Sequence, residues 1–168
     1  MDLAVTGLSG SADAERGGVL PLEEARAQLA ALLAGETDLI ANAANFTAFL
    51  NDQLTAVNWV GFYFLQGSEL VLGPFQGRPA CVRIPAGKGV CGTCVATGDV
   101  QRIADVHAFP GHIACDIRSR SELVIPLKNG ATIVGVLDID SPQTDRFSLA
   151  DQHYVEALLA EFSRAQFS

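Results

Sequence analysis

The spacing of hydrophobic residues divides the chain into a helical beginning, a strand-rich middle and a helical end. Residues 21–35 and 37–54 carry apolar residues at the spacing of amphipathic helices, with a proline opening the first segment and a glycine following it. Asp38 or Thr37 is a suitable N-cap for the second helix, because both side chains accept hydrogen bonds from a first turn. Residues 1–20 are rich in Gly, Ser and Asp, and we expect them to form a flexible tail.

The middle of the chain alternates short apolar runs with turn residues, which is typical of β-strands. Aromatic and β-branched residues fill the first run, and Gln66-Gly67-Ser68 predicts a tight turn into the second. The Asn-Gly pair of Lys128-Asn129-Gly130 predicts a hairpin between the last two strands. The predicted strands are 58–65, 69–75, 81–84, 100–103, 122–127 and 131–140, with a short glycine-bounded helix at 89–98.

The end of the chain predicts a third long helix and completes the fold class. Ser148 and Asp151 have the spacing of a capping box, which predicts the start of a helix over residues 151–167. Helices at both ends of a run of strands indicate an α+β domain with a largely antiparallel sheet. A chain of 168 residues is long enough for one sizeable core, so residues 21–168 are predicted to form a single domain.

Composition restricts the class of protein and the class of partner. Hydrophobic residues make up 49% of the chain and charged residues 18%, as in globular domains. The net charge of −8 argues against binding to nucleic acid or to an anionic membrane, since both attract clustered Lys and Arg. No apolar run approaches the roughly 20 residues that span a bilayer, and we expect no secretory signal. The four cysteines then predict a cytoplasmic protein with reduced thiols.

Three acidic residues are predicted to meet at one end of the hairpin. Asp138 and Asp140 are two residues apart on one strand, so their side chains emerge on the same face, and Leu137 and Ile139 face the core. Glu122 begins the partner strand at a similar distance from the turn. Three adjacent carboxyls repel one another, which raises the pKa of at least one of them. The alternative is a solvated strand end with ordinary pKa values.

Each cysteine has a reactive interpretation and a packing interpretation. Cys115 lies in a polar loop, GHIACD, where a nucleophile is accessible, although free cysteines commonly pack as small hydrophobes. Cys81 begins a predicted strand and Cys91 lies in the short helix, so either is a second thiol or a packing residue. Cys94 completes a Cys-x-x-Cys pair with Cys91, which is typical of redox motifs beside a βαβ unit that this pattern lacks. An alanine-like packing role therefore suits Cys94 better, and a Cys91–Cys94 disulfide is the alternative.

A zinc site is a weaker alternative for the same residues. His107 and His112 lie near the cysteines, and tetrahedral Cys/His sites are common for zinc. The remaining spacings form no second Cys-x-x-Cys pair and no His-x-His pair. We therefore expect no bound metal.

Five segments resemble the free methionine-(R)-sulfoxide reductases, which are catalytic GAF domains. The segments NWVGFYF, GKGVCGT, VHAFPGHIACD, SELVIPL and GVLDIDSP occur in order between residues 58 and 147. The resemblance implies a six-stranded antiparallel GAF sheet flanked by the terminal helices, usually in a homodimer. It also implies reduction of free methionine-(R)-sulfoxide through sulfenic acid and disulfide intermediates, with thioredoxin as external reductant, supplied by NADPH through thioredoxin reductase, and no bound cofactor.

The resemblance also suggests roles for individual residues. Cys115 would attack the sulfoxide, with Cys81 as the main resolving thiol and Cys91 as the other candidate, whereas the family usually has a small non-thiol residue at Cys94. The three acids, Glu122, Asp138 and Asp140, would donate protons and bind the substrate ammonium. Trp59 and Tyr63, on one strand face, would contact the substrate. From position alone, a loop containing His112, Ile113 and Ala114 would close over the ligand and offer N–H groups to its carboxylate.

Two further functions remain open from the sequence. One is a sensory GAF module that binds a small ligand without catalysis, and the other is a redox switch whose disulfide alters packing. Thiols combined with acids have no evident purpose in simple binding, which favours the enzyme. An acid cluster does disfavour a thiolate at Cys115 unless protons or a substrate ammonium neutralise it.

Overall fold

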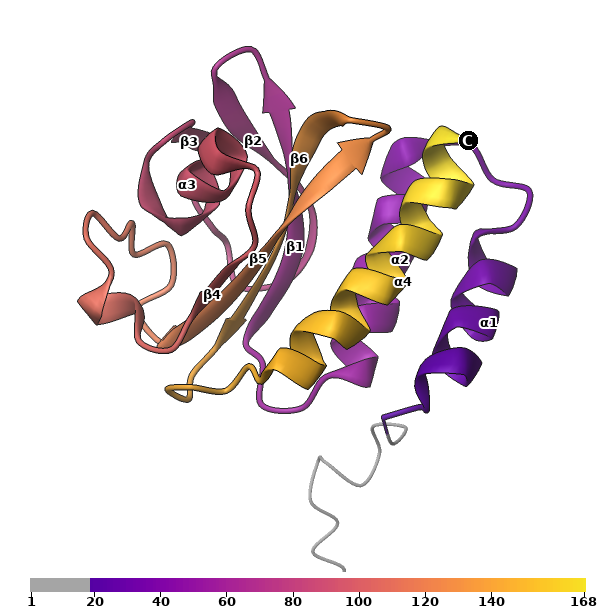
Figure 1. Ribbon diagram of the computed structural model, residues 1–168, viewed down its shortest axis with the longest axis horizontal. Coiled ribbons are helices and arrows are strands. Elements are labelled where there is room, and N and C mark those ends of the chain that lie inside the picture. The colour runs from indigo at the N-terminus through magenta and orange to yellow at the C-terminus, as the bar shows by residue number, and fades with distance from the viewer. Residues whose placement is uncertain (1–18) are drawn as a thin grey trace, which may run out of the picture.

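The computed structural model describes residues 19–168, so most of the predicted tail, residues 1–18, lies outside it. Six antiparallel strands form one sheet, as predicted, and their order is β3-β2-β1-β6-β5-β4 (Figure 1). The strands are β1 (Trp59–Gln66), β2 (Glu69–Gly77), β3 (Arg83–Pro85), β4 (Gln101–Ile103), β5 (Ser121–Asn129) and β6 (Thr132–Ser141). The helices are α1 (Leu22–Leu33), α2 (Leu39–Gln53), α3 (Gly89–Thr97) and α4 (Leu149–Phe167), with a 3-10 turn η1 (Val106–Ala108).

The sheet separates two layers of different character. Helices α2 and α4 cover one face, with α1 packed outside them, and α3 lies with the long loops on the other face (Figure 1). The helical layer encloses the larger core, which includes Leu137 and Ile139 of β6 as predicted. A smaller core under α3 contains Cys91 and Cys94. The layer on the α3 side of the sheet therefore has the smaller core, which leaves room for a site.

Helix capping follows the predicted signals. The Asp38 side chain accepts a hydrogen bond from the backbone N–H of Ala41 at 2.8 Å and caps α2. Ser148 and Asp151 form the capping box of α4, with both reciprocal hydrogen bonds present. Among residues 19–168, no helix is long and apolar enough to cross a membrane.

Two local predictions were wrong in detail. The third strand begins at Arg83, so Cys81 lies in the β2–β3 connection, where its backbone is free of the strand ladder. In the β5–β6 hairpin, Asn129 pairs with Thr132, and the turn is formed by Gly130 and Ala131. Gly130 has a backbone φ of +61°, which favours glycine, and it occupies the first position of the turn. The turn therefore centres one residue later than the Asn-Gly pair suggests.

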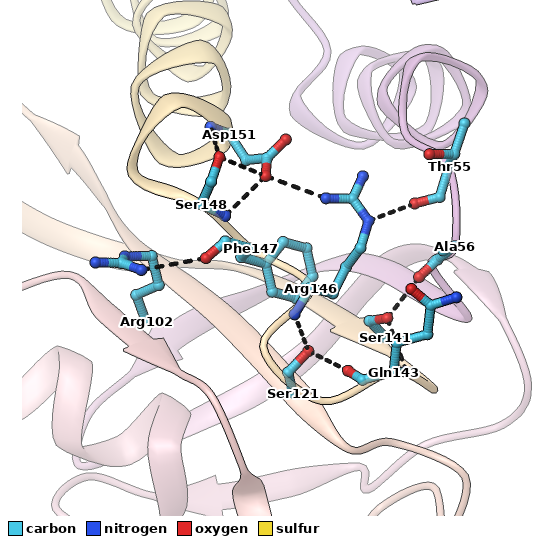
Figure 2. A network of polar contacts seen from close by, with 10 residues as sticks. All are labelled: Thr55, Ala56, Arg102, Ser121, Ser141, Gln143, Arg146, Phe147, Ser148 and Asp151. Carbon is cyan, nitrogen blue, oxygen red and sulfur yellow. Dashed lines mark hydrogen bonds and ion pairs between the residues drawn. The ribbon is translucent and has the colours of Figure 1, made fainter.

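A polar network holds the end of the β5–β6 hairpin where the acids lie (Figure 2). Ser121 and Ser141 pair across the two strands, one residue from Glu122 and Asp140. The Ser121 hydroxyl donates to the carbonyl oxygen of Gln143 at 2.6 Å, and the Ser141 hydroxyl donates to the carbonyl oxygen of Ala56 at 2.6 Å. These bonds tie both strands to neighbouring loops and fix the strand register at this end of the sheet.

The same network reaches the helical layer. The Arg146 guanidinium donates to the carbonyl oxygen of Thr55 at 2.9 Å and to Asp151 at 3.1 Å (Figure 2). Asp151 also belongs to the capping box of α4. Arg146, in the loop after β6, therefore joins the loop before β1 to the start of α4 near the strand ends that carry the acids.

Candidate functional site

The hairpin register brings the three predicted acids together. Glu122 lies directly opposite Asp140, and Asp138 pairs with Val124, two residues further along β5. Side chains two residues apart share a face, so all three carboxyls emerge on the α3 side of the sheet. Asp138 and Glu122 are each only 6% exposed. The prediction of a shared strand end is confirmed, and the solvated alternative is wrong.

A small cavity of about 30 Å³ lies above these acids. Its walls come from the β3–α3 region and from the loop that precedes β5. The lining residues are Ile84, Lys88, Gly89, Val90, Cys91, His112, Ile113, Cys115, Asp116, Ser119, Glu122, Asp138 and Asp140. A small ligand inside would contact thiol, imidazole and carboxyl groups at once.

The acids are arranged to retain protons. Burial raises the pKa of Glu122 well above its usual range, and repulsion from Asp138 and Asp140 adds to this effect. Burial also raises the pKa of Asp138 to about 6. The pKa of Asp140 rises for the same main cause, with a further contribution from the charge of Asp138. Near neutral pH the cluster therefore carries fewer negative charges than its three carboxyls suggest, and it can donate protons.

Cys91 is a neutral partner of these acids. Its thiol donates to Oε1 of Glu122, with 3.8 Å between sulfur and oxygen. Burial raises the pKa of Cys91 well above its usual range, and the charges of Asp138 and Glu122 add to the rise. A thiol in this environment stays protonated and is a weak nucleophile.

Cys81 and Cys115 form a disulfide, with their Cα atoms 5.4 Å apart. Cys115 lines the cavity, whereas Cys81 lies beside it in the β2–β3 connection. The hydroxyl of Tyr63 donates to the carbonyl oxygen of Cys81 at 2.9 Å, which holds that connection against β1. The bridge therefore joins two loops at the edge of the cavity.

Cys94 takes no part in the bridge or the cavity. It is fully buried, and its thiol donates to the carbonyl oxygen of Val124 with 3.8 Å between sulfur and oxygen. Burial raises the pKa of Cys94 to about 12. Cys91 and Cys94 are both free thiols in this structure, so the alternative of a disulfide between them is not formed.

The predicted aromatic residues lie beside the acids, on the neighbouring strand β1, and do not line the cavity. Trp59 is 2% exposed; it stacks between Tyr63 and Phe75, with ring centroids 5.8 and 5.2 Å away. Its indole N–H donates to the carbonyl oxygen of Arg78 at 3.1 Å. A β-carbon at Gly61 would lie 2.4 Å from the indole, so glycine is required for the ring to lie over β1. In this disulfide state the aromatic residues pack in the smaller core next to the site.

The predicted loop contributes two of its three residues to the cavity. His112 and Ile113 line it, whereas Ala114 is exposed and does not. Burial, with a contribution from His107, lowers the pKa of His112. Its Nε2 lies 3.9 Å from Oε2 of Glu122, so a neutral imidazole faces a protonated carboxyl and no strong ion pair forms.

Sequence reasoning missed a second polar cluster at the cavity wall. Asp116 accepts hydrogen bonds from the Arg118 guanidinium, the shortest at 2.6 Å, and from the amide of Asn58 at 3.2 Å. The bonds from Arg118 lower the pKa of Asp116, so this acid is ionised while its neighbours are protonated. The same Asn58 amide donates to Ser119. The acid-x-Arg spacing in the sequence is the only signal that could have suggested the pair.

One group in the described part of the chain has the geometry for a metal. Ligand atoms of Cys91, Glu122 and Asp138 lie within 4.8 Å of one another. Metal binding requires deprotonated ligands, whereas all three pKa values are raised, which favours protons. The alternative zinc site with both histidines is not assembled, because Cys81 and Cys115 are bonded together and His107 is exposed beside Asp105.

The buried acids predict a stability that falls as pH rises. Below about pH 4, the pKa of an unfolded aspartate, both states hold the proton of Asp138. Between there and about 6 only the folded state holds it, so the free energy of unfolding decreases across this window. Asp138→Asn should remove roughly 2–3 kcal/mol of this decrease. Denaturant unfolding of the oxidised protein at pH 4 and 7 measures it, with Asp99→Asn as an exposed control; equal pH dependence in all three proteins would contradict the prediction.

Comparison with known proteins agrees with this arrangement. The GAF domain family matches residues 38–165. The free methionine-R-sulfoxide reductase of Escherichia coli is 55% identical over 134 residues, which cover 80% of this chain and 81% of the relative. The reduced form of the fRMsr of Staphylococcus aureus has a TM-score of 0.83 and 51% identity, covering 86% of this chain and 94% of that one.

A third relative was solved in complex with its substrate. The free methionine-R-sulfoxide reductase of Neisseria meningitidis has a TM-score of 0.81 and 42% identity, covering 86% of this chain and 87% of that one. The matches cover most of both chains, and the GAF domain match spans the strands that carry the acids. The chain therefore belongs to the GAF domain family and, within it, to the free methionine-R-sulfoxide reductases.

Proposed function

We propose that this protein reduces free methionine-(R)-sulfoxide to methionine, with Cys115 as the nucleophile. The observation that carries the proposal is a disulfide cysteine at a cavity whose floor is three acids with raised pKa values. A sulfoxide oxygen must be protonated as it leaves, and a thiol must attack the sulfur. The cavity supplies both groups at once, and the substrate named for the relatives requires the same pair.

The proposed reaction balances in three steps. The Cys115 thiolate attacks the sulfoxide sulfur while a carboxyl of the cluster protonates the oxygen; the sulfoxide S–O bond then breaks as the oxygen passes to the Cys115 sulfur, so methionine leaves and Cys115 becomes a sulfenic acid. The Cys81 thiol then condenses with the sulfenic acid, releasing water and forming the Cys81–Cys115 disulfide. An external dithiol reduces this disulfide to two thiols and is itself oxidised.

The protonated acids remove the repulsion that a thiolate at Cys115 would otherwise meet. Raised pKa values leave Glu122 and Asp140 largely neutral near pH 7, so little negative charge faces the sulfur. Oδ1 of Asp138 is buried without a hydrogen-bond partner in the described structure, which leaves an acceptor for the substrate ammonium. We assign Cys91 to holding Glu122, since its neutral thiol already donates there.

Substrate contacts of the remaining predicted residues form part of the proposal. His112 and Ile113 would close the cavity over the ligand. Trp59, Tyr63 and Ala114 do not line it in the disulfide state, so their contact with substrate is a prediction for the reduced protein. We further propose thioredoxin as the reductant, a homodimer as the assembly and the cytoplasm as the compartment.

A coupled assay tests the function directly. Reduced protein mixed with free methionine-(R)-sulfoxide, thioredoxin, thioredoxin reductase and NADPH should consume NADPH and release methionine in equal amounts. Peptide-bound methionine sulfoxide should be a poor substrate, because the cavity is small and its lining acids offer contacts to the free ammonium group, which a peptide-bound residue lacks. Binding of the sulfoxide with no release of methionine, under either thioredoxin or dithiothreitol, would instead support a sensory module.

A further inference from the structure

The surface around the disulfide is unusually apolar for this protein. In the described part of the chain, seven large hydrophobic side chains are exposed, and three of them lie within two residues of a bridged cysteine. They are Val82 at 64%, Ile113 at 36% and Ile117 at 87% exposure. Exposed apolar clusters of this kind commonly mark contact surfaces.

The disulfide keeps these three residues close to one another, and we call them the patch. Bridged Cα atoms are 5.4 Å apart, and neighbouring Cα atoms along the chain are about 3.8 Å apart. The Cα atoms of Val82 and Ile117 therefore lie within roughly 17 Å of one another, with the disulfide between them. Both loops lie on the α3 side of the sheet, away from the long helices (Figure 1). An interface of the small size usual for transient redox encounters would cover the whole patch.

The charge around the patch differs from that of the whole protein. Residues 78–120 contain six of the 11 Lys and Arg residues but only three of the 19 Asp and Glu residues. Arg78, Lys88 and Arg120 are exposed and have no carboxylate partner among the described residues. The segment that carries both bridged cysteines thus has a surplus of basic residues in an acidic protein, which suits a partner with an acidic surface.

We propose that Val82, Ile117 and the exposed edge of Ile113 form the docking surface for the dithiol protein that reduces the Cys81–Cys115 disulfide. The inference rests on the proposed function, in which this disulfide must be reduced in every turnover. The partner has a reactive thiol set in a flat apolar surface with acidic surroundings, and thioredoxin is the probe. Its thiolate attacks one bridge sulfur and displaces the other cysteine; its second thiol then resolves the mixed disulfide, so the partner loses two electrons and two protons to Cys81 and Cys115.

The apolar side chains are needed because the attacking sulfur must reach the bridge in line. The partner protein can bring its sulfur into contact with the bridge only if the surface around the disulfide excludes water and matches the partner in shape. Arg118 follows Ile117 in the chain, but its guanidinium is hydrogen-bonded to Asp116. Its side chain therefore does not cover the exposed hydrophobic residues of the patch. Neither Val82 nor Ile117 lines the cavity, so these two residues can be changed without altering the cavity wall, to which Ile113 belongs.

The test compares two reductants in one double variant. In Val82→Ser/Ile117→Ser, the KM for thioredoxin should rise about tenfold, while turnover with dithiothreitol stays within twofold of wild type. Ile40→Ser/Leu149→Ser is the matched control, since both residues are similarly exposed on helices far from the patch. Its KM for thioredoxin should be unchanged, and wild-type KM should rise with ionic strength. Equal melting temperatures verify folding.

A second measurement separates this inference from the proposed function. Single-turnover reduction of the preformed disulfide by thioredoxin needs no sulfoxide, and its second-order rate constant should fall about tenfold in the double variant. Failure to reduce methionine-(R)-sulfoxide with dithiothreitol would overturn the function but leave this rate test intact. An unchanged rate constant, or a wild-type disulfide that dithiothreitol reduces and thioredoxin does not, would overturn the docking surface.

Discussion

Replacement of Cys115 by serine is expected to abolish reduction of methionine-(R)-sulfoxide, with a loss of at least roughly 10³-fold to the assay background. A few per cent of an ordinary thiol is ionised at neutral pH, whereas a serine hydroxyl is not, and oxygen is a far weaker nucleophile toward sulfur. The cavity and its acids would remain, because the serine is nearly the same size. Substrate binding should therefore survive while turnover is lost, under both thioredoxin and dithiothreitol.

Two further cysteine variants make this result specific. Cys94→Ala should keep near wild-type activity, since that thiol is buried away from the cavity with a pKa raised to about 12. Cys81→Ser should complete one turnover and then stop with thioredoxin, because the sulfenic acid forms but the disulfide cannot. Rapid-quench measurement of methionine gives the first turnover, and mass spectrometry locates the oxidised cysteine. Full activity in Cys115→Ser would show that another residue attacks.

The acid cluster could be predicted from sequence because its geometry is local. Two residues on one strand share a face by the period of the strand alone, and an Asn-Gly pair fixes the hairpin that brings Glu122 opposite Asp140. An error of one residue in the turn did not matter, since the prediction required only similar distances of Glu122 and Asp138 from the turn; the register itself shifts between Leu127 and Lys128. Local patterns of this kind also gave the helix caps at Asp38 and Ser148.

The remainder of the site depends on contacts between distant segments. Composition alone did not determine which cysteine bonds to Cys115; the pairing with Cys81 spans 34 residues of sequence and came from resemblance. Strand alternation places Trp59 and Tyr63 on the face of the site, but it does not show that packing against Phe75 buries them beside the cavity. The ionised pair of Asp116 and Arg118 depends on the fold of an irregular loop, where no periodic signal exists.

Asp140→Asn is expected to lower kcat/KM for methionine-(R)-sulfoxide by about 10²–10⁴-fold, the range usual for loss of a general acid. Asn has the size of Asp but holds no transferable proton, and Asp140 lies opposite Glu122 at the cavity floor. Asp145→Asn makes the same substitution at an exposed position in the loop after β6 and should leave activity unchanged. Steady-state assays with dithiothreitol compare the two variants without involving thioredoxin docking.

The pH profile distinguishes proton donation from simple positioning. A thiolate nucleophile makes kcat/KM rise with pH, whereas a carboxyl donor works only while protonated, so the rate falls once pH exceeds the raised pKa of the cluster. Wild type should therefore give a bell-shaped profile, and Asp140→Asn should lose or displace its falling limb. A variant that keeps the limb but has a higher KM would make Asp140 a ligand for the substrate ammonium. Near-normal rates over the whole pH range would show that Asp140 has no part in the reaction, and the proton would then have to come from Glu122 or Asp138, the only other buried carboxyls that line the cavity in the described structure.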